Sequence, residues 1–244
     1  TDFDALSREP DVSLRYVRQG ESLGRPDLII LPGSKNTTED LLYLKEQGYE
    51  AAIQSLAAQG TPVVGICGGY QMLGQKLLDP LHTESDLPEL AGLGLLPVVT
   101  TLAAGKLTVQ VEALPSGGRT FLGVAPQGGR LRGYEIHMGR TEFVGPVQPA
   151  FSIVQRSGEP VESVDGVVSD NGLVLGTYLH GIFDNDDFRR SILDALRLRK
   201  GLPALTGGSP TYSEQKEAAY DRLADLVRAN LDMAAIRRAM GLPL

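Results

Sequence analysis

The sequence lacks the features that mark several protein classes. Its 244 residues include a single cysteine, Cys67, so an internal disulfide is excluded and a reducing compartment, the cytoplasm, is the expected location. A lone cysteine also argues against a structural zinc site, and we expect no metal. Lysine and arginine number 23 against 30 acidic residues, a formal net charge of −7. This balance disfavours binding to a nucleic-acid backbone.

Long apolar stretches are also lacking. No run approaches the roughly 20 residues that span a bilayer, and no charged-then-apolar start indicates a signal peptide, so we expect no membrane partner. Hydrophobic residues make up 42% and charged residues 22%, which is typical of globular proteins. The first residues, Thr1–Leu6, resemble a loop that follows a strand, so we expect the chain to be a piece of a longer protein.

The first third of the sequence alternates between two kinds of pattern. The short apolar runs Asp27–Leu31 and Pro62–Ile66 predict buried strands. Between them, Asn36 or Thr37 can cap a helix, and Gly48 divides that helix from a second one. Another helix follows the second strand directly. Strands alternating with helices predict an α/β fold with a parallel sheet.

The middle of the chain, rich in Gly, Val and Thr, predicts a largely antiparallel section. The strands expected there are Val98–Thr101, Thr108–Val111, Tyr134–Thr141, Phe151–Val154 and Val174–Tyr178. Exposed turns are expected at Pro115–Gly118 and Pro126–Gly129.

The end of the chain is predicted to be helical. Asp184 or Asn185 can cap one helix, and a short link at Gly207–Pro210 follows it. Thr211 with Glu214 then has the pattern of a capping box that starts a further helix. We assign these C-terminal helices, residues 211–240, to the same domain as the rest, so that the domain covers 1–244.

The segment Gly65–Gly69 has the layout of a nucleophile elbow, with Cys67 in the place of the usual serine. Small neighbours allow the sharp turn from strand to helix, and the helix N-terminus favours a thiolate. The backbone N–H of Gly68 would then stabilise an oxyanion. A free cysteine is more commonly just a small buried hydrophobe, but the preceding strand is the context that an elbow requires.

A thiolate nucleophile needs a proton-transfer partner, and the sequence offers three histidines. His82 lies in a polar loop and is expected to be a solvated side chain. His180 ends a predicted strand, where catalytic residues of α/β proteins are found, so we expect it to be the acid/base. For His137 the simpler expectation is a satisfied polar side chain, and the alternative is a role in lining a pocket.

Four segments resemble one family of enzymes. Gly65–Gln71 is similar to the cysteine motif of class I (triad-type) glutamine amidotransferases, and Leu31–Thr37 is similar to their oxyanion loop. Gly133–Thr141 and Gly176–Asp184 narrow the resemblance to the carboxy-terminal glutaminase domains of the cobyric acid synthase branch. The segments occur in the family's order, and the resemblance covers the whole chain.

The resemblance implies a fold and a set of site residues. The fold is flavodoxin-like, with a mostly parallel sheet flanked by helices. Cys67 and His180 would be catalytic. The oxyanion would be held at Gly33, Ser34 and Gly68, and substrate would be bound by Gln71, Tyr134 and His137.

The resemblance also implies partners. Glutamine would be the substrate, and no cofactor is expected in this domain. An amino-terminal P-loop synthetase domain would use ATP and magnesium. Its G-x-x-x-x-G-K-[ST] motif does not occur in this chain, so that domain is absent here. The ammonia would amidate carboxylates of a corrin, cobyrinic acid a,c-diamide, in cobalamin biosynthesis.

One position departs from the usual triad. Most triad-type amidotransferases carry a glutamate two residues after the histidine, and here that position is Ile182. Asp184 and Glu135 are candidates for the group that orients His180, on chemistry alone. A dyad is the other interpretation, because a thiolate–imidazolium pair depends less on a third member.

Three other functions remain open from the residues. A glutaminase subunit that amidates peptidoglycan lipid II has a similar cysteine motif. A cysteine-elbow hydrolase of another class has the same local layout. A non-catalytic binding domain could keep the fold without the chemistry.

Overall fold

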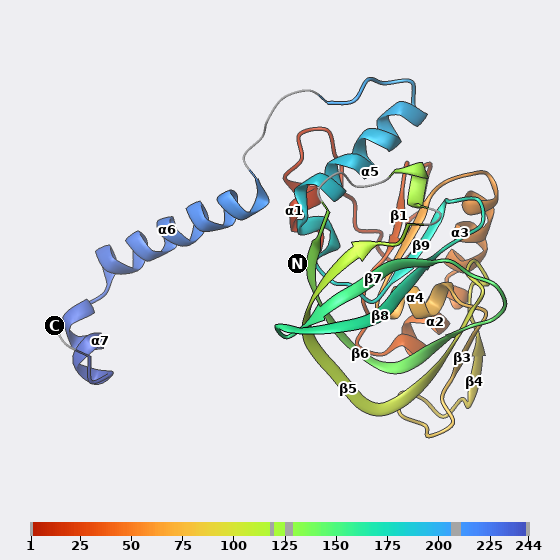
Figure 1. The fold of residues 1–244 in the computed structure, drawn as a ribbon, viewed down its shortest axis with the longest axis horizontal. Coiled ribbons are helices and arrows are strands. Elements are labelled where there is room, and N and C mark those ends of the chain that lie inside the picture. The colour runs from red at the N-terminus through yellow and green to blue at the C-terminus, as the bar shows by residue number, and fades with distance from the viewer. Residues whose placement is uncertain (1, 118–119, 125–128, 206–210, 243–244) are drawn as a thin grey trace. The chain divides into compact units, whose positions relative to one another are not determined.

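The computed structural model describes residues 2–117, 120–124, 129–205 and 211–242 (Figure 1). They belong to two compact units, Thr1–Leu205 and Thr206–Leu244. The expected link at 207–210, most of the turn at 126–129 and the end of the turn at 115–118 lie outside the described residues. None of the described helices is both long and apolar enough to cross a bilayer.

The first unit is built on one mixed sheet. Within the described residues its strand order is β1-β2-β9-β8-β7-β5-β3-β4, with β6 paired to β5. The strands are β1 (Ile29–Leu31), β2 (Val63–Ile66), β3 (Lys76–Leu78), β4 (Glu89–Ala91), β5 (Val98–Pro115), β6 (Leu131–Phe143), β7 (Pro149–Arg156), β8 (Glu159–Val168) and β9 (Val174–Thr177).

Helices precede, connect and follow the strands. They are α1 (Asp4–Ser7), α2 (Thr37–Glu46), α3 (Tyr49–Ala58), α4 (Gly68–Leu73) and α5 (Asp186–Arg199), with single 3₁₀ turns η1 (Phe121–Gly123) and η2 (Ile182–Asp184). Asn36 caps α2 as predicted, because its side chain accepts a hydrogen bond from the Glu39 N–H at 3.0 Å. Gly48, with φ of 74°, separates α2 from α3.

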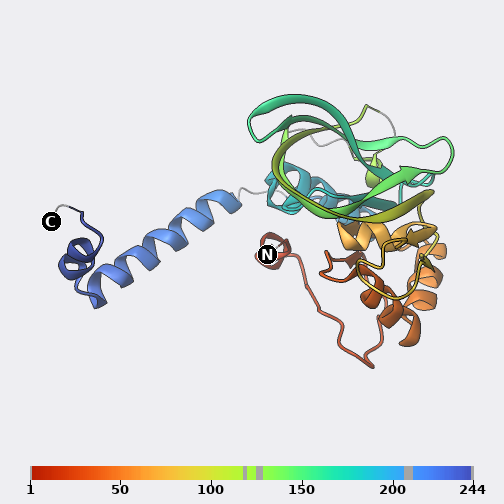
Figure 2. The same ribbon diagram turned by 90° about the horizontal axis from the view of Figure 1, so that it is seen from below.

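The parallel part of the sheet consists of β1, β2 and β9, together with the pair β3–β5. The antiparallel part is larger than the sequence indicated, since the strands expected at 98–101 and 108–111 belong to the single long strand β5. A register shift between Thr101 and Lys106 bends β5 where the two predictions were separated. In Figure 2 the green strands of this section curve over one side of the unit, away from the orange helices.

The core lies around β2 and β9, whose residues are all buried. The helix that starts at Gly68 is buried along its whole length. Such burial on both sides is typical of central parallel strands, and it fixes the backbone at their carboxyl ends. Cys67 directly follows β2, and His180 comes shortly after the end of β9.

The second unit contains α6 (Tyr212–Asn230) and α7 (Met233–Ala239). The predicted capping box is present: the Thr211 side chain accepts from the Glu214 N–H, and the Glu214 carboxylate accepts from the Thr211 N–H. The Asp232 side chain caps α7 by accepting a hydrogen bond from the Ala235 N–H at 2.9 Å.

Candidate active site

Cys67 occupies a sharp turn between β2 and α4. Its backbone has φ of 53° and ψ of −112°, a conformation that non-glycine residues rarely adopt. Hydrogen bonds hold it there: the Cys67 N–H donates to the Thr177 carbonyl at 2.9 Å, and the Cys67 carbonyl accepts from the Gln71 N–H at 3.1 Å. The predicted elbow geometry is therefore present, with the strain that such turns carry.

His180 lies on the neighbouring strand end and is paired with an acid that the sequence interpretation missed. Its Nδ1 is 2.7 Å from Oδ2 of Asp2, and the Gly181 N–H donates to the other Asp2 oxygen at 3.1 Å. Both side chains are largely buried, with 9% of His180 and 14% of Asp2 exposed. Asp2 therefore fixes both the ring orientation and the backbone beside it, as the third member of a triad would.

The two candidates proposed from sequence do not hold the ring. Glu135 is paired instead with Arg156, whose Nε lies 3.0 Å from the carboxylate. The nitrogen that Asp184 would have to contact is bonded to Asp2. The triad position after the histidine, Ile182, is buried and apolar. Asp2 is therefore a third group beside Cys67 and His180, whereas the alternative interpretation was a dyad of those two residues alone.

The charge on Asp2 shifts the titration of His180. Burial by itself lowers the pKa of His180, but the hydrogen bond and the charge of Asp2, together with the neighbouring Cys67 side chain, raise it to about 9. Burial conversely raises the pKa of Asp2, and its contacts with His180 and Gly181 outweigh this, so that its pKa is lowered. Near neutral pH the pair is therefore an aspartate and an imidazolium.

Cys67 and His180 meet around Gly33. A Cβ placed on Gly33 would lie 3.0 Å from Cε1 of His180 and 3.6 Å from Cβ of Cys67, so a side chain here would crowd the pair. The Cys67 thiol donates to the Ile136 carbonyl at 3.3 Å, and no described residue hydrogen-bonds the buried Nε2 of His180. The thiol is therefore hydrogen-bonded to a backbone carbonyl rather than to the imidazole beside it.

The oxyanion residues predicted from sequence lie beside this pair. Gly68 is the first residue of α4, so its N–H has no carbonyl one turn earlier to bond. A Cβ on Gly68 would lie 2.9 Å from the Ser34 backbone nitrogen, which shows how closely the two segments approach. The Ser34 hydroxyl donates to Asp40 at 2.5 Å, which fixes the loop. Two backbone nitrogens thus converge near Cys67.

Gln71 lines the pocket, but its polar atoms are used within the protein. Its amide nitrogen donates to the Met138 carbonyl at 3.0 Å and to the Tyr178 hydroxyl at 3.1 Å, and its oxygen accepts from Thr37 at 3.0 Å. It is only 2% exposed. Gln71 therefore joins α4 to the oxyanion loop and to β6, and its direct polar contacts are with the protein.

The two aromatic residues predicted to bind substrate stack on other rings. Tyr134 stacks on His180 with ring centroids 4.9 Å apart, and its backbone exchanges two hydrogen bonds with that residue. His137 stacks on Tyr178 at 3.8 Å. Burial lowers the pKa of His137, which keeps its ring neutral near pH 7.

Asp2 and the predicted site residues other than Gly68 line one pocket of about 460 Å³. Besides these residues, it is lined by three charged side chains: Lys35, Glu84 and Lys106. Glu84 is held by its position beside α2, where its carboxylate accepts from the Thr38 N–H at 3.1 Å. The sequence interpretation missed Glu84 and Lys106, because neither lies in a motif.

Comparison with known proteins agrees with this geometry. A protein-family model described as "CobB/CobQ-like glutamine amidotransferase domain" matches residues 1–188. The chain belongs to this family. Two solved structures share the amidotransferase fold: "Crystal structure of glutamine amidotransferase", with a TM-score of 0.55 over 80% of this chain and 91% of that chain, and "Structure of PurLQS from Thermotoga maritima", with 0.56 over 75% and 85%. At 22% identity these neighbours show the fold alone, and they confirm the predicted fold class.

Curated relatives are more similar in sequence. The chain is 50% identical over 236 residues to the cobyric acid synthase of Streptococcus sanguinis (strain SK36), covering 97% of this chain and 45% of the relative. It is 51% identical over 248 residues to the cobyric acid synthase of Pelotomaculum thermopropionicum, covering 100% and 47%. This amidotransferase domain therefore spans less than half the length of these relatives.

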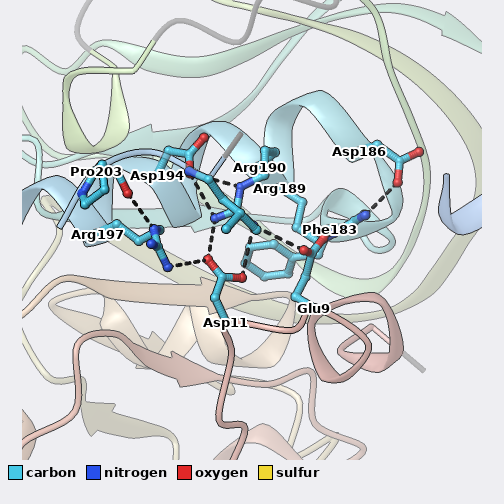
Figure 3. Close-up of polar contacts among 10 residues, drawn as sticks. Glu9, Asp11, Phe183, Asp186, Arg189, Arg190, Asp194, Arg197 and Pro203 are labelled. Atoms are coloured by element: carbon cyan, nitrogen blue, oxygen red, sulfur yellow. Dashed lines mark hydrogen bonds and ion pairs between the residues drawn. The ribbon is translucent and has the colours of Figure 1, made fainter. Parts of the chain in front are cut away.

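The segment that carries Asp2 in this amidotransferase domain is anchored to α5 by ion pairs (Figure 3). The Arg189 Nε contacts Glu9 at 2.6 Å, and the same guanidinium donates to the Phe183 carbonyl at 2.7 Å. Arg189 is thus bonded both to the chain after Asp2 and to the turn after His180. It connects the two segments whose side chains form the Asp2–His180 pair.

A second carboxylate extends this anchor. Asp11 contacts Arg190 at 2.8 Å and Arg197 at 3.1 Å, and Arg190 also contacts Asp194 (Figure 3). The Asp11 side chain is 11% exposed. Hydrogen bonds from Arg190 are the main cause of a lowered pKa at Asp11, so the carboxylate stays charged.

Proposed function

We propose that this chain is the glutaminase part of a cobyric acid synthase, which hydrolyses glutamine and supplies ammonia for amidation of corrin carboxylates. The observation that carries the proposal is a cysteine on a strained elbow next to a histidine that is held by a buried aspartate. The similarity to cobyric acid synthases over nearly the whole chain supports the choice among amidotransferases.

The first half-reaction forms a thioester. The Cys67 thiolate attacks the side-chain carboxamide carbon of glutamine, and the electron pair of the C=O bond moves to oxygen. The N–H groups of Gly68 and of the Gly33–Ser34 loop would stabilise that oxyanion. The imidazolium of His180 donates its proton to the departing nitrogen, the C–N bond breaks, and ammonia leaves a γ-glutamyl thioester on the sulfur.

The second half-reaction regenerates the enzyme. His180, now neutral, accepts a proton from water as the water oxygen attacks the thioester carbon. The C–S bond breaks, glutamate leaves, and the Cys67 thiolate again faces an imidazolium. Asp2 stays ionised throughout and stabilises the charged form of the ring.

The charges of the pocket suit a free amino acid. Glutamine carries an α-carboxylate and an α-ammonium group at neutral pH, and the pocket walls offer both Lys35 or Lys106 and the carboxylate of Glu84. A volume of about 460 Å³ lies within the range of small-molecule sites. These three side chains are the ones we assign to the α-amino-acid end of glutamine.

The remaining chemistry belongs to residues outside this chain. Activation of the corrin carboxylates would use ATP and magnesium in a synthetase domain, with cobyrinic acid a,c-diamide as the ammonia acceptor. This chain has no P-loop motif, so we assign no ATP-dependent step to it. We further propose that its glutaminase is slow alone, because the Cys67 thiol is hydrogen-bonded to the Ile136 carbonyl rather than to His180.

The decisive experiment replaces the nucleophile. In Cys67→Ala, glutamate and ammonia release should fall to background, while far-UV circular dichroism and thermal unfolding stay at wild-type values. Acid quenching of the wild-type reaction should show the mass of one γ-glutamyl group on the protein, located by peptide mapping at Cys67. Glutamine hydrolysis by pure Cys67→Ala protein, or an adduct at another residue, would refute the mechanism.

A further inference from the structure

A buried carboxylate that the reaction does not use lies next to β9. Asp165 belongs to β8 and is 4% exposed. Burial raises its pKa to about 6, although hydrogen bonds from Thr177 and Tyr178 oppose this rise. Asp165 is therefore largely ionised near pH 7. Because a charge in the protein interior costs free energy, we looked for a role of this carboxylate beyond packing.

The strand β8 places Asp165 where its pairing with β9 ends. The two strands lie side by side, and their paired register ends at Val167 and Gly176 (Figure 1). Gly166 has φ of 69°, and a Cβ there would lie 2.3 Å from the Gly176 carbonyl oxygen, so a side chain is excluded. The residue before it, Asp165, forms its hydrogen bonds with the chain just beyond Gly176.

Asp165 replaces a strand partner for residues 177–179. The Thr177 hydroxyl donates to one carboxylate oxygen, and the Tyr178 N–H donates to the other at 3.0 Å. The Leu179 N–H donates in turn to the Thr177 hydroxyl oxygen at 3.0 Å. Buried backbone N–H groups need acceptors, and here the carboxylate and the hydroxyl supply them after the ladder has ended. Asp165 thus fixes the path of the chain that leaves β9.

The segment that Asp165 holds contacts the nucleophile and leads to the base. The Thr177 carbonyl accepts the Cys67 N–H at 2.9 Å, which helps to keep Cys67 in its strained backbone conformation with φ of 53°. His180 comes directly after Leu179. A shift of residues 177–179 would therefore move the acceptor of the Cys67 N–H and the base together.

The side chain of Tyr178 connects the same segment to the wall of the pocket. Its hydroxyl accepts from the Gln71 amide at 3.1 Å, and its ring stacks on His137 with centroids 3.8 Å apart. Gln71 and His137 both line the pocket, whereas Asp165 does not. Asp165 therefore acts on the site through the backbone of β9 and not through contact with a bound molecule.

We propose that Asp165 is a positioning residue for both Cys67 and His180. Through the Thr177 hydroxyl it holds the residue whose carbonyl accepts the Cys67 N–H. Through the Tyr178 N–H it holds the chain that ends at His180. The kinetic test of this role rests on the proposed glutaminase function, so a second measurement that needs no glutamine accompanies it.

Replacing Asp165 by asparagine tests the role with little change in volume. In Asp165→Asn one acceptor oxygen becomes an NH₂ group, which cannot accept a hydrogen bond. In the complete protein, kcat for glutamine hydrolysis should fall about 10- to 100-fold, the effect of a small displacement of reacting groups. KM should change less than about threefold, because Asp165 does not line the pocket.

A control variant measures the effect of lost stability alone. Leu77 is 1% exposed in β3, which is separated from β9 by several strands of the sheet. Leu77→Ala should lower the Tm, as the removal of a buried side chain does, while kcat stays within about threefold of the wild-type value. Equal losses of kcat in Leu77→Ala and Asp165→Asn at similar Tm would reduce Asp165 to a general stabilising residue and overturn the proposal.

A pair of variants at Thr177 tests the connection to the nucleophile. Thr177→Val removes the hydroxyl and should lower kcat about as much as Asp165→Asn, whereas Thr177→Ser keeps the hydroxyl and should recover most of the rate. The double variant Asp165→Asn/Thr177→Val should be no more than about threefold slower than the slower single variant, because both changes break one contact. Equal kcat values for Thr177→Val and Thr177→Ser would overturn the proposal even if Asp165→Asn failed to fold.

Alkylation of Cys67 by iodoacetamide gives the measurement that needs no glutamine. The thiolate is the reactive form, so the rate at pH 7 reports how well the imidazolium of His180 faces the sulfur. Asp165→Asn and Thr177→Val should slow alkylation about fivefold or more, and Leu77→Ala should leave it unchanged. Wild-type alkylation rates in both slow variants would overturn the positioning role. A wild-type protein that hydrolyses no glutamine but shows the expected alkylation pattern would refute the proposed function and support the role of Asp165.

Discussion

The active site joins two regions that are built in different ways. Cys67 and His180 lie at the ends of β2 and β9, whose residues are completely buried and paired on both sides. Asp2 belongs to a segment, residues 2–27, with one helix of four residues and an extended stretch without backbone partners. The nucleophile and base are thus positioned by the sheet, whereas the acid lies on a segment held by the buried side chain of Leu6 and by ion pairs at Glu9 and Asp11.

The first region thus determines the geometry of the site, and the second affects the protonation of His180. The sheet fixes where Cys67 and His180 stand. Asp2 helps to raise the pKa of His180, and the segment that carries Asp2 forms ion pairs with α5 through Glu9 and Asp11. Substitutions in the first region should therefore remove activity, and those in the second should shift its pH dependence.

The largest loss of activity is expected when His180, the acid/base, is replaced. His180→Ala should reduce kcat for glutamine hydrolysis by about 10²–10⁴-fold, the usual contribution of a positioned acid/base. His137→Ala is the matched control in the same pocket. Its ring stacks on Tyr178 and stays neutral, so kcat should change less than tenfold. A dead His137→Ala with an active His180→Ala would reverse the two roles.

Sequence reasoning was successful where the requirement was local. An elbow needs a strand, small residues and a nucleophile within five positions, so Gly65–Gly69 could be interpreted without the fold. The ends of buried strands were likewise recognisable from short apolar runs. The capping box at Thr211 is local in the same sense.

It failed where the requirement was tertiary. Asp2 and His180 are 178 positions apart, and no pattern in residues 1–6 marks an acid that returns to the site. The candidates Asp184 and Glu135 were named on chemistry alone, whereas in the structure Glu135 pairs with Arg156. The long strand β5 was predicted as two strands, 98–101 and 108–111, whereas in the structure it continues through a register shift between Thr101 and Lys106.

A smaller effect, which depends on pH, is expected for Asp2→Asn. The amide can still accept the ring N–H but carries no charge, so the pKa of His180 should fall from about 9 towards or below its ordinary value of 6.5. At pH 8 this change alone would reduce the imidazolium fraction by about thirtyfold, and at pH 6 by less than twofold. The basic limb of the kcat/KM profile should move to lower pH.

The raised pKa of His180 also makes the stability of the fold depend on pH. A pKa raised in the folded state stabilises the fold fully below pH 6.5, and the contribution is lost as pH rises through about 9. Thermal unfolding should therefore separate wild type from Asp2→Asn more at pH 6 than at pH 10. Asp4→Asn, two residues away, is the control for both profiles. An unchanged basic limb in Asp2→Asn would show that Asp2 does not tune His180.

The smallest effect is expected one step further from the reaction, at Asp11. Asp11→Asn removes a largely buried carboxylate from Arg190 and Arg197, which should cost about 1.5–3 kcal/mol of stability, the range for hydrogen bonds to charged groups. Asp27→Asn is the matched control, because its pair with Lys200 is more than half exposed and should be worth less than about 1 kcal/mol.

Comparing Asp11→Asn with Asp27→Asn also distinguishes two roles of Asp11, which are positioning the segment that carries Asp2 and stabilising the fold in general. Because Asp11 anchors the segment that carries Asp2, its loss should move the basic limb of kcat/KM part of the way towards that of Asp2→Asn, whereas Asp27→Asn should leave it in place. Urea unfolding and the pH profile of glutamine hydrolysis measure the two quantities separately. If Asp11→Asn is destabilised while its pH profile stays at the wild-type position, the ion pairs hold the N-terminal segment but not the geometry of Asp2.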